Sequence, residues 1–465
     1  MRTSSVFLPH ERKAVSSLAA LYCFRMFGLF MLLPVLAVYG SQYADHSPFT
    51  LGLALGAYGL SQAFFQIPFG MMSDKYGRKP LILGGLIIFI LGSVVAATAD
   101  NVYELIIGRF LQGCGAISAA VMALLTDLTS DENRTKAMAS IGASIGISFA
   151  VAMTLGPLLA AYAGVSSIFW LTALLGLIGI YILLKHVPEV AAPAPAGRDV
   201  VAAPHLIKTT LLHPELARLN LGIFVLHFVL MATFVVLPDL LHNQVGIDKT
   251  YHGLVYFPLL VIAFVLMVPF VIVAEKRRKI KPVFLLAIML LVLSELLLLI
   301  VGTSQVLALV ALFIFFFAFN ILEATQPSLV SKIASAGTKG TATGVYATCQ
   351  VLGVFGGGAL GGYLLTYYSA SSIYTVSSIM IGVWLLVALG MRPPKFLASV
   401  MMPLDGRDSP SVRETLLQVE GVEDAVVVLS ENMIYLKVDH QLVDRHALVE
   451  IVENLPKMHP HESLT

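Results

Sequence analysis

Several ionisable and amide side chains lie inside long apolar runs of this chain, where they are candidates for chemistry. They are Arg25, Arg109, Gln112, His227, Asn320 and Glu323. A charged group inside a bilayer is costly, so it is expected to face a bundle interior or a wet cavity and to have a partner. A carboxyl can carry a proton, and so can an imidazole. Structural roles stay open for His227, as a hydrogen-bonded histidine, and for Arg109, as an anchor bonded to carbonyls.

A charged segment bracketed by glycines separates two of the apolar runs. The segment covers 70–80 and contains Gly70, Asp74, Lys75, Gly77, Arg78 and Lys79. Glycine permits a tight turn and a close approach of helices, and the cations are those expected on the cytoplasmic face of a membrane. The runs at 50–72 and 81–98 are each long enough to cross the ~30 Å hydrocarbon core of a bilayer. The segment is therefore expected to be a turn at the membrane surface.

Composition places most of the chain in a membrane. Of the 465 residues, 57% are hydrophobic and 12% are charged, and the formal net charge is +1. These values exclude an ordinary soluble globule and argue against a nucleic-acid partner. Twelve apolar spans predict twelve transmembrane helices. They fall at 14–39, 50–72, 80–99, 103–127, 136–160, 167–185, 217–241, 251–274, 283–302, 305–327, 340–366 and 371–391. Glu295 lies in the ninth span. Two interpretations stay open for it: a protonated carboxyl without a function, or a residue that marks an interface.

Loop charges predict the orientation of the chain. Lys and Arg residues concentrate on the side of the 70–80 segment, and Lys249 stands alone on the other side, so both termini are expected in the cytoplasm. Cys23, Cys114 and Cys349 are isolated in apolar runs and predict neither a disulfide framework nor a metal site. No phosphate loop, metal cluster or nucleophile-base pair is readable, so no cofactor is expected and an enzyme is disfavoured.

The two halves of the membrane region repeat, which predicts two pseudo-symmetric six-helix halves. Asp74 in the first half falls opposite Glu275 in the second, and basic residues follow both acids. The halves are expected to cover 1–187 and 216–392. Between them, a cytoplasmic linker is expected at 188–215. Its first part, 188–204, is rich in alanine and proline and is expected to be semi-extended, and a surface helix at 206–218 is expected to lead into the seventh span.

A soluble tail, residues 396–465, follows the last span. Its pattern predicts strands at 399–402, 425–429 and 433–438 and helices at 410–418 and 443–455. The order β-α-β-β-α resembles a ferredoxin-like domain, whose last strand would come from the stretch after Pro456. The tail lacks a Cys-x-x-Cys pair, so a role in binding heavy metals has no ligands. Two roles stay open, a stability or assembly module and a regulator that docks on the cytoplasmic loops.

Three motifs resemble those of the major facilitator superfamily. The 70–80 segment is similar to motif A, with Met72 at a position where the family more often has leucine. Motif B is matched by Leu105, Arg109, Gln112, Gly113, Gly115 and Ala116. Gly156 and Pro157 are similar to the end of the antiporter motif, although alanines replace four of its glycines. Small residues at this spacing also let helices pack closely in lipid.

The resemblance implies an all-α polytopic membrane protein of the drug:proton antiporter type, with twelve helices and a small α+β ferredoxin-like domain. Two halves would rock about a site at the midplane. Arg25, Arg109 and Gln112 would line this site or couple protons together with His227, Asn320 and Glu323. At the membrane surface, Asp74 would face the positive end of the helix that starts near Gly340, and Arg78 would pair with Asp127. These contacts would latch one state.

The function implied is proton-coupled export of small amphipathic molecules by a monomer in the bacterial inner membrane. Its partners would be the lipid bilayer, a small-molecule substrate and protons. Two alternatives stay open: a sugar or metabolite facilitator of the same superfamily, and a membrane sensor that binds a ligand and signals through the tail.

Overall fold

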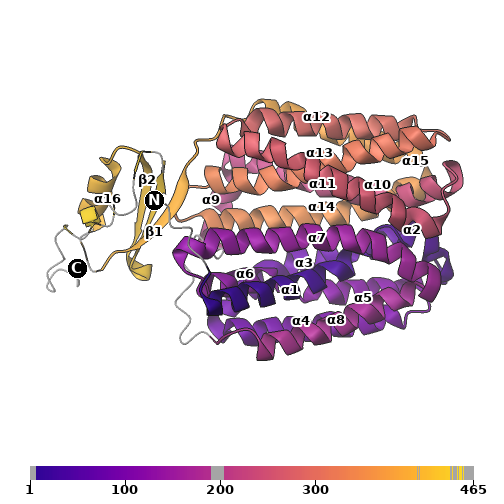
Figure 1. Ribbon diagram of the computed structural model, residues 1–465, viewed down its shortest axis with the longest axis horizontal. Helices are drawn as coiled ribbons and strands as arrows, with labels where there is room; N and C mark the ends of the chain where they lie inside the picture. The colour runs from indigo at the N-terminus through magenta and orange to yellow at the C-terminus, as the bar shows by residue number, and fades with distance from the viewer. Residues whose placement is uncertain are drawn as a thin grey trace.

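The structure is a computed structural model that describes residues 7–189, 204–405, 407, 409–439, 442–443, 448, 450–452 and 454. Two helical bundles lie side by side, one from each half of the chain, and a small sheet domain lies beyond one end of them (Figure 1). We name this end of the bundles the tail end and the opposite one the far end. The architecture is the predicted helical membrane fold with a small α+β domain.

The N-terminal bundle differs from prediction in two helices, which are broken. Its elements are α1 (Pro9–Phe30), α2 (Leu36–Tyr39), η1 (Gly40–Gln42), α3 (Pro48–Tyr76), α4 (Arg78–Ala97), α5 (Val102–Cys114), α6 (Ser118–Asp127), α7 (Asp131–Ala163) and α8 (Val165–Lys185). The span expected at 14–39 is interrupted at 31–35, which contains Pro34, a residue with no N–H for the helical ladder. The span expected at 103–127 is interrupted at 115–117. There Gly115 packs so closely on the Gly85 carbonyl that a Cβ would collide with it.

The C-terminal bundle follows the segment 190–203, which lies outside the described residues and includes half of the expected linker. Its elements are η2 (Pro204–Leu206), α9 (Ile207–Leu212), α10 (Pro214–Asp239), η3 (Leu240–Gln244), η4 (Lys249–Tyr251), α11 (His252–Lys276), α12 (Ile280–Leu299), α13 (Gln305–Ile333), α14 (Lys339–Tyr367) and α15 (Ala370–Leu389). The turn η3 is a π-helix that extends α10. Helix α10 is buried along most of its length, so it forms the centre of this bundle.

Eleven stretches of the described residues are long and apolar enough to cross a membrane. Helix α3 is not among them, but it has 29 residues and at the usual rise is about 44 Å long. It carries the buried polar residues Ser61, Gln62 and Gln66, which make it less apolar than its neighbours. Each of the twelve predicted spans therefore coincides with a long helix or with a broken pair of helices.

The two bundles touch through α3 and α14. A Cβ on Gly52 of α3 would collide with the carbonyl of Gly358, and one on Gly362 of α14 would lie 2.5 Å from the Pro48 carbonyl. The amide of Phe49 also donates a hydrogen bond across the boundary, to Thr366 Oγ1 at 2.9 Å. Glycines on both helices therefore allow a backbone-to-backbone contact near the far end.

The tail contains a three-stranded antiparallel sheet in the order β1-β3-β2. Its described elements are β1 (Ala398–Pro403), α16 (Ser409–Leu417), β2 (Val422–Val428), η5 (Leu429–Glu431) and β3 (Met433–Val438). The apolar core of the tail is formed by the sheet and α16, and it includes Val400, Leu416 and Ile434. This order fits the ferredoxin-like domain predicted from the sequence. The expected last strand after Pro456, and most of the expected helix 443–455, lie outside the described residues.

Candidate functional site

Two buried arginines and a tyrosine form a polar cluster inside the N-terminal bundle. Arg25 of α1 and Arg109 of α5 are 1% and 0% exposed. Their guanidinium carbons lie 5.7 Å and 5.2 Å from the centre of the Tyr58 ring of α3. Arg25 also donates hydrogen bonds to Ser118 Oγ at 2.5 Å and to Gln62 Oε1 at 3.3 Å. We name Arg25, Tyr58 and Arg109 the arginine cluster.

Backbone carbonyls and an amide hold Arg109 in place. Its Nε donates to the Ala54 carbonyl at 3.3 Å, and its Nη1 donates to the Gly28 carbonyl at 3.4 Å and to Gln112 Oε1 at 2.8 Å. Gln112 in turn donates to Ser93 Oγ at 2.8 Å. Within the described part of the chain, neither arginine of the cluster forms an ion pair. Carbonyl dipoles, an amide and an aromatic face therefore compensate both positive charges.

A second polar cluster lies in the C-terminal bundle and joins three helices. Gln350 Nε2 of α14 lies 2.8 Å from His227 Nε2 of α10 and donates to Glu323 Oε1 of α13 at 3.2 Å. The other ring nitrogen of His227 lies 3.3 Å from the Ile223 carbonyl, which only accepts, so we assign the ring proton to Nδ1. His227 Nε2 lies 3.8 Å from Glu323 Oε2. We name His227, Glu323 and Gln350 the carboxyl cluster. Asn320 is half-buried and joins no hydrogen bond among the described residues.

Glycines on α14 bring the carboxyl cluster together. A Cβ on Gly353 would collide with the Phe224 carbonyl of α10, and one on Gly357 would collide with the Phe228 carbonyl. The two backbones can approach this closely only because the side chains are absent. Gln350 lies about one turn before Gly353 and two turns before Gly357 on α14, on the side that faces α10.

Arg78 of the charged segment at 70–80 forms a buried ion pair with Asp127 at the end of α6. Arg78 Nε donates to Asp127 Oδ2 at 3.1 Å, so the predicted contact is present, and Nη1 donates to Ser73 Oγ at 2.7 Å. Lys79 Nζ donates to the Val187 carbonyl at 2.7 Å. The first turn of α4 is thus tied to the ends of α3, α6 and α8.

The remaining residues of this segment shape the turn between α3 and α4. Gly77 has φ of 93°, a conformation that favours glycine. A Cβ on Gly70 would lie 3.3 Å from Ala119 Cβ of α6, so α3 packs closely there. Lys75 is exposed. The side chain of Asp74 lies outside the described residues.

Gly156 and Pro157 lie within α7, where that helix packs on the break between α1 and α2. A Cβ on Gly156 would collide with the Met31 carbonyl. The small residue therefore has a packing role, which agrees with one of the two interpretations of this motif.

A family model for the Major Facilitator Superfamily matches residues 18–358. The chain belongs to this superfamily. Among curated proteins, the inner membrane transport protein YajR of Escherichia coli K12 is 42% identical over 446 residues, which are 96% of this chain and 98% of the relative. The match extends over the tail, so this relative shares both parts of the chain. An uncharacterised transporter of Buchnera aphidicola is 35% identical over 75% of this chain and 89% of its own.

Other comparisons cover less of the chain or show the fold alone. The multidrug resistance protein MdtL of Escherichia coli is 31% identical over 151 residues, 32% of this chain and 39% of the relative. A solved bacterial homologue of the human lysosomal transporter Spinster has a TM-score of 0.65 at 14% identity and covers 83% of this chain and 97% of its own. The human organic anion transporter TETRAN has a TM-score of 0.61 at 21% identity, with 82% and 100% covered.

Three residues of this major facilitator that contribute to the arginine cluster were not predicted, namely Tyr58, Ser93 and Ser118. Hydroxyl groups in apolar helices are a weak signal, because they also bond to their own helix. Ser118 does follow directly after the break at 115–117, so a polar residue at the start of a half-helix was the available clue.

The tail of this major facilitator docks on the C-terminal bundle through the open face of its sheet. Lys437 Nζ of β3 donates to the Ser331 carbonyl at 2.7 Å, and Asp424 Oδ2 of β2 accepts from the Ala336 amide at 3.0 Å. Tyr435 is buried and forms a small apolar cluster with Ala336. These contacts hold the end of α13 and the turn that leads into α14.

A salt bridge at the edge of the sheet adds to this docking. Arg278, after α11, donates to both carboxylate oxygens of Asp439, with the shortest distance 3.1 Å. Its guanidinium carbon also lies 5.4 Å from the centre of the Phe396 ring. The described contacts of the tail therefore include both loops at the tail end of the C-terminal bundle.

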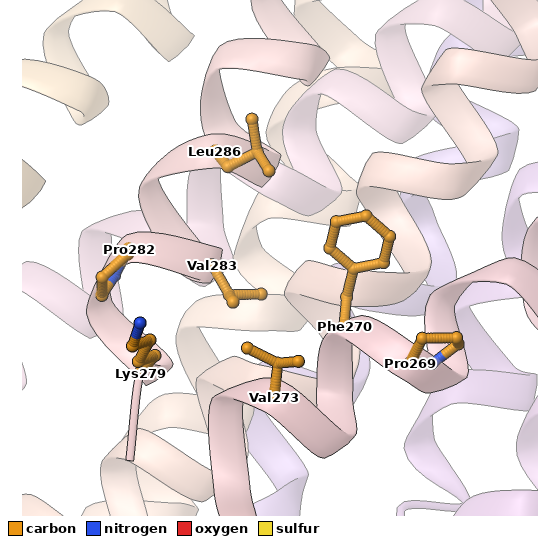
Figure 2. Close-up of a pocket in the computed structure, with 7 residues that line it drawn as sticks. All are labelled: Pro269, Phe270, Val273, Lys279, Pro282, Val283 and Leu286. Carbon is orange, nitrogen blue, oxygen red and sulfur yellow. The ribbon is translucent and has the colours of Figure 1, made fainter. Parts of the chain in front are cut away.

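A hollow of about 340 Å³ lies between α11 and α12 near the tail end. Figure 2 shows its lining side chains, which are Pro269, Phe270, Val273, Lys279, Pro282, Val283 and Leu286. Six of the seven are apolar, and neither polar cluster contributes to it. Such a lining suits contact with acyl chains rather than chemistry.

Proposed function

We propose that the chain is a proton-coupled exporter of small amphipathic molecules that works by alternating access. The observation that carries the proposal is the carboxyl cluster, which links α10, α13 and α14 through hydrogen bonds. A titratable group shared by three helices is suited to couple proton binding to helix movement.

Glu323 is the proton carrier in this proposal. Its side chain is 37% exposed although it lies well inside α13, so space is present beside it. Ionised, the carboxylate would attract a cationic solute, and proton binding would remove this attraction. Gln350 would keep the carboxyl oriented in both forms, because its amide bonds to His227 as well.

Arg78 and Asp127 are proposed as part of a latch that favours one state. Their charge-assisted bond joins the starts and ends of helices in the N-terminal bundle. Asp74 completes this latch in the proposal by facing the N-terminus of α14, which is a dipole contact of about 1 kcal/mol. Arg25, Arg109 and Gln112 would then supply fixed positive charge beside the transport path.

The proposal includes the arrangement of the chain in the membrane. We infer six-helix halves at 1–187 and 216–392, a linker at 188–215 and a tail domain at 396–465, with both termini in the cytoplasm. The tail end of the bundles is then the cytoplasmic face of an inner membrane. The protein would act as a monomer. The similarity of one third of the chain to a multidrug resistance protein supports an amphipathic substrate.

Flux in liposomes tests the function. The full chain would be reconstituted with a pH-sensitive dye and ethidium, a lipophilic cation, inside, with the membrane potential clamped and the outside acidic. We expect proton uptake that requires ethidium and is lost in Glu323→Gln. An exposed tail residue gives the matched control, Glu420→Gln, which should behave like the wild type. If proton uptake were the same with and without the solute for every lipophilic cation tested, the proposal would be contradicted.

The two alternatives give other outcomes in the same liposomes. Labelled glucose that equilibrates without proton movement would indicate a facilitator. Binding of ethidium without flux would indicate a sensor. The contacts of the tail with Ser331 and Ala336 favour a regulatory role for the tail in any of the three, because they hold the turn before α14.

A further inference from the structure

Glu295 of α12 is a buried carboxyl outside both polar clusters. It is 0% exposed. Its Oε1 accepts a hydrogen bond from Thr233 Oγ1 of α10 at 3.0 Å, and its Oε2 has no hydrogen-bond partner among the described residues. An ionised carboxylate with one neutral donor is costly to keep in such a place. The group is therefore neutral as long as this packing holds.

Buried hydroxyl groups without partners among the described residues lie on the two helices α11 and α15, which both pack on α12. Tyr374 OH and Ser377 Oγ of α15, which packs on α12, and Tyr256 OH of α11 are buried and form no hydrogen bond with described residues. Tyr374 lies within electrostatic reach of both Glu295 and Tyr256. The cluster is polar, enclosed and incompletely bonded, which is unusual for a site with only a packing role.

The cluster lies close to the far end of the bundle. Glu295 is four residues before the end of α12, and Tyr374 is four residues after the start of α15, so each is about 6 Å along its helix from that end. Asp239 ends α10 at the same level, and Tyr374 is within its electrostatic reach too. The π-helical turn η3 follows directly after Asp239, and such turns often mark functional positions.

We propose that Glu295 is a second proton-binding carboxyl, loaded by water that enters from the far end past Asp239 and Tyr374, and that its proton controls the hydrogen bond that joins α12 to Thr233 of α10. This rests on the proposed function only in assuming that protons drive the transporter. In the loading step, a hydronium ion from the far end protonates the Glu295 carboxylate through intervening water and the Tyr374 hydroxyl, which gives one proton and takes one. Tyr374 ends neutral, the hydronium ion becomes water, and one proton has moved inward.

Among the described residues, no arginine or lysine bonds to Glu295, so no fixed positive charge would replace its proton. Helix α10 contributes Asp239, α15 contributes Tyr374, and α11 contributes Tyr256 and, next to its ring, His252. Helix α13 has no titratable residue between 305 and 322. Loss of the proton would leave a bare charge beside α10, so deprotonation requires that water reach the cluster or that the helices separate.

Thr233 links the protonation state of Glu295 to the rest of the bundle. It lies on α10 six residues after His227, on the helix that also carries part of the carboxyl cluster. A change in the Glu295–Thr233 contact therefore shifts the same helix that the carboxyl cluster holds. The two carboxyls are linked through one rigid element rather than through a direct contact.

Infrared spectroscopy of the full chain in lipid nanodiscs, without any solute, tests this proposal. The carbonyl stretch of protonated carboxyls would be followed from acidic to alkaline pH and during exchange into heavy water. We expect one pH-dependent band to vanish in Glu295→Gln and to shift in Thr233→Val, which removes the donor. Tyr374→Phe should keep the band but slow its exchange at least threefold, and Asp239→Asn should do the same.

Other outcomes of this experiment overturn the proposal. A band that vanishes in Glu295→Gln but never titrates or exchanges would identify a static neutral carboxyl. Loss of the band on addition of sodium at constant pH would identify a metal-cation site. Melting temperatures of the variants check that each is folded, and Glu323→Gln should leave this band in place. Failure of the proposed function would instead appear in the liposome flux of Glu323→Gln.

Discussion

The polar clusters inside the two bundles carry charge of opposite kinds. The arginine cluster of the N-terminal bundle holds Arg25 and Arg109 with carbonyls, amides and a tyrosine ring, and no described carboxylate pairs with them. The C-terminal bundle holds Glu323 and the buried Glu295 with amide and hydroxyl partners, and no arginine or lysine among its described residues bonds to either. The arginine cluster thus carries fixed charge, and these carboxyls carry charge that can be switched.

This difference assigns different work to the two halves. A guanidinium stays protonated at any physiological pH, so the arginine cluster cannot release a proton and can act only through its position and its field. Carboxyls and a histidine can change charge, so we propose that proton coupling lies in the C-terminal bundle. The resemblance to motif B implied a role of Arg109 in proton coupling, and we propose that this role is electrostatic.

Glu323→Gln is expected to have the largest effect, because it removes the switchable charge. Solute-driven proton flux in liposomes should fall to the level of empty vesicles, while binding of a neutral solute persists. The fold should be kept, since glutamine can still accept from Gln350. Flux equal to that of the wild type would remove the C-terminal bundle from the coupling mechanism.

Replacing Arg109 by alanine should mainly lower stability. The change strands the carbonyls of Ala54 and Gly28 and leaves Gln112 without its partner, at a cost of about 3 kcal/mol. Thermal unfolding of the purified protein measures the loss. Arg109→Lys keeps the charge with fewer donors. Its stability in thermal unfolding is expected to lie between that of the wild type and that of Arg109→Ala. If Arg109→Lys were fully stable but changed the pH dependence of flux, the comparison between fixed and switchable charge would fail.

Asp127→Asn should have a smaller effect, confined to the turn between α3 and α4. It converts the charge-assisted bond with Arg78 into a neutral one, while the bond from Arg78 to Ser73 remains. The loss should be about 1.5 kcal/mol and should appear as faster hydrogen exchange at the first turn of α4. Asp100→Asn, at an exposed position near the far end, is the control and should leave this exchange unchanged.

Sequence patterns predicted the helices well and the sites only in part. Apolar runs fixed the spans because a bilayer requires them, and the ion pair of Arg78 with Asp127 could be expected from a motif. Pro34 was a local signal for the break at 31–35 that the prediction did not use, whereas the break at 115–117 depends on a contact between distant segments, Gly115 on the Gly85 carbonyl. The same holds for Gln350, whose contact with His227 depends on how α14 packs on α10.

The smallest effect on stability is expected at the docking contact between the tail and Arg278. This contact bears on the comparison of the two bundles because the described contacts of the tail lie on the C-terminal bundle. Arg278→Ala removes an exposed ion pair with Asp439, which is a loss of at most about 1 kcal/mol. Hydrogen exchange of β3 should rise by less than about fivefold.

The buried docking contact gives the stronger test of the same surface. Lys437→Met removes the bond to the Ser331 carbonyl and should raise exchange of β3 more than Arg278→Ala does. It should also change the rate of proton flux, because the end of α13, which leads into α14, is released. The melting temperatures of the Arg109 variants should not change when Lys437→Met is added to them. A change in flux from Lys437→Met with no change in exchange at α14 would show that the tail acts through another route than its docked face.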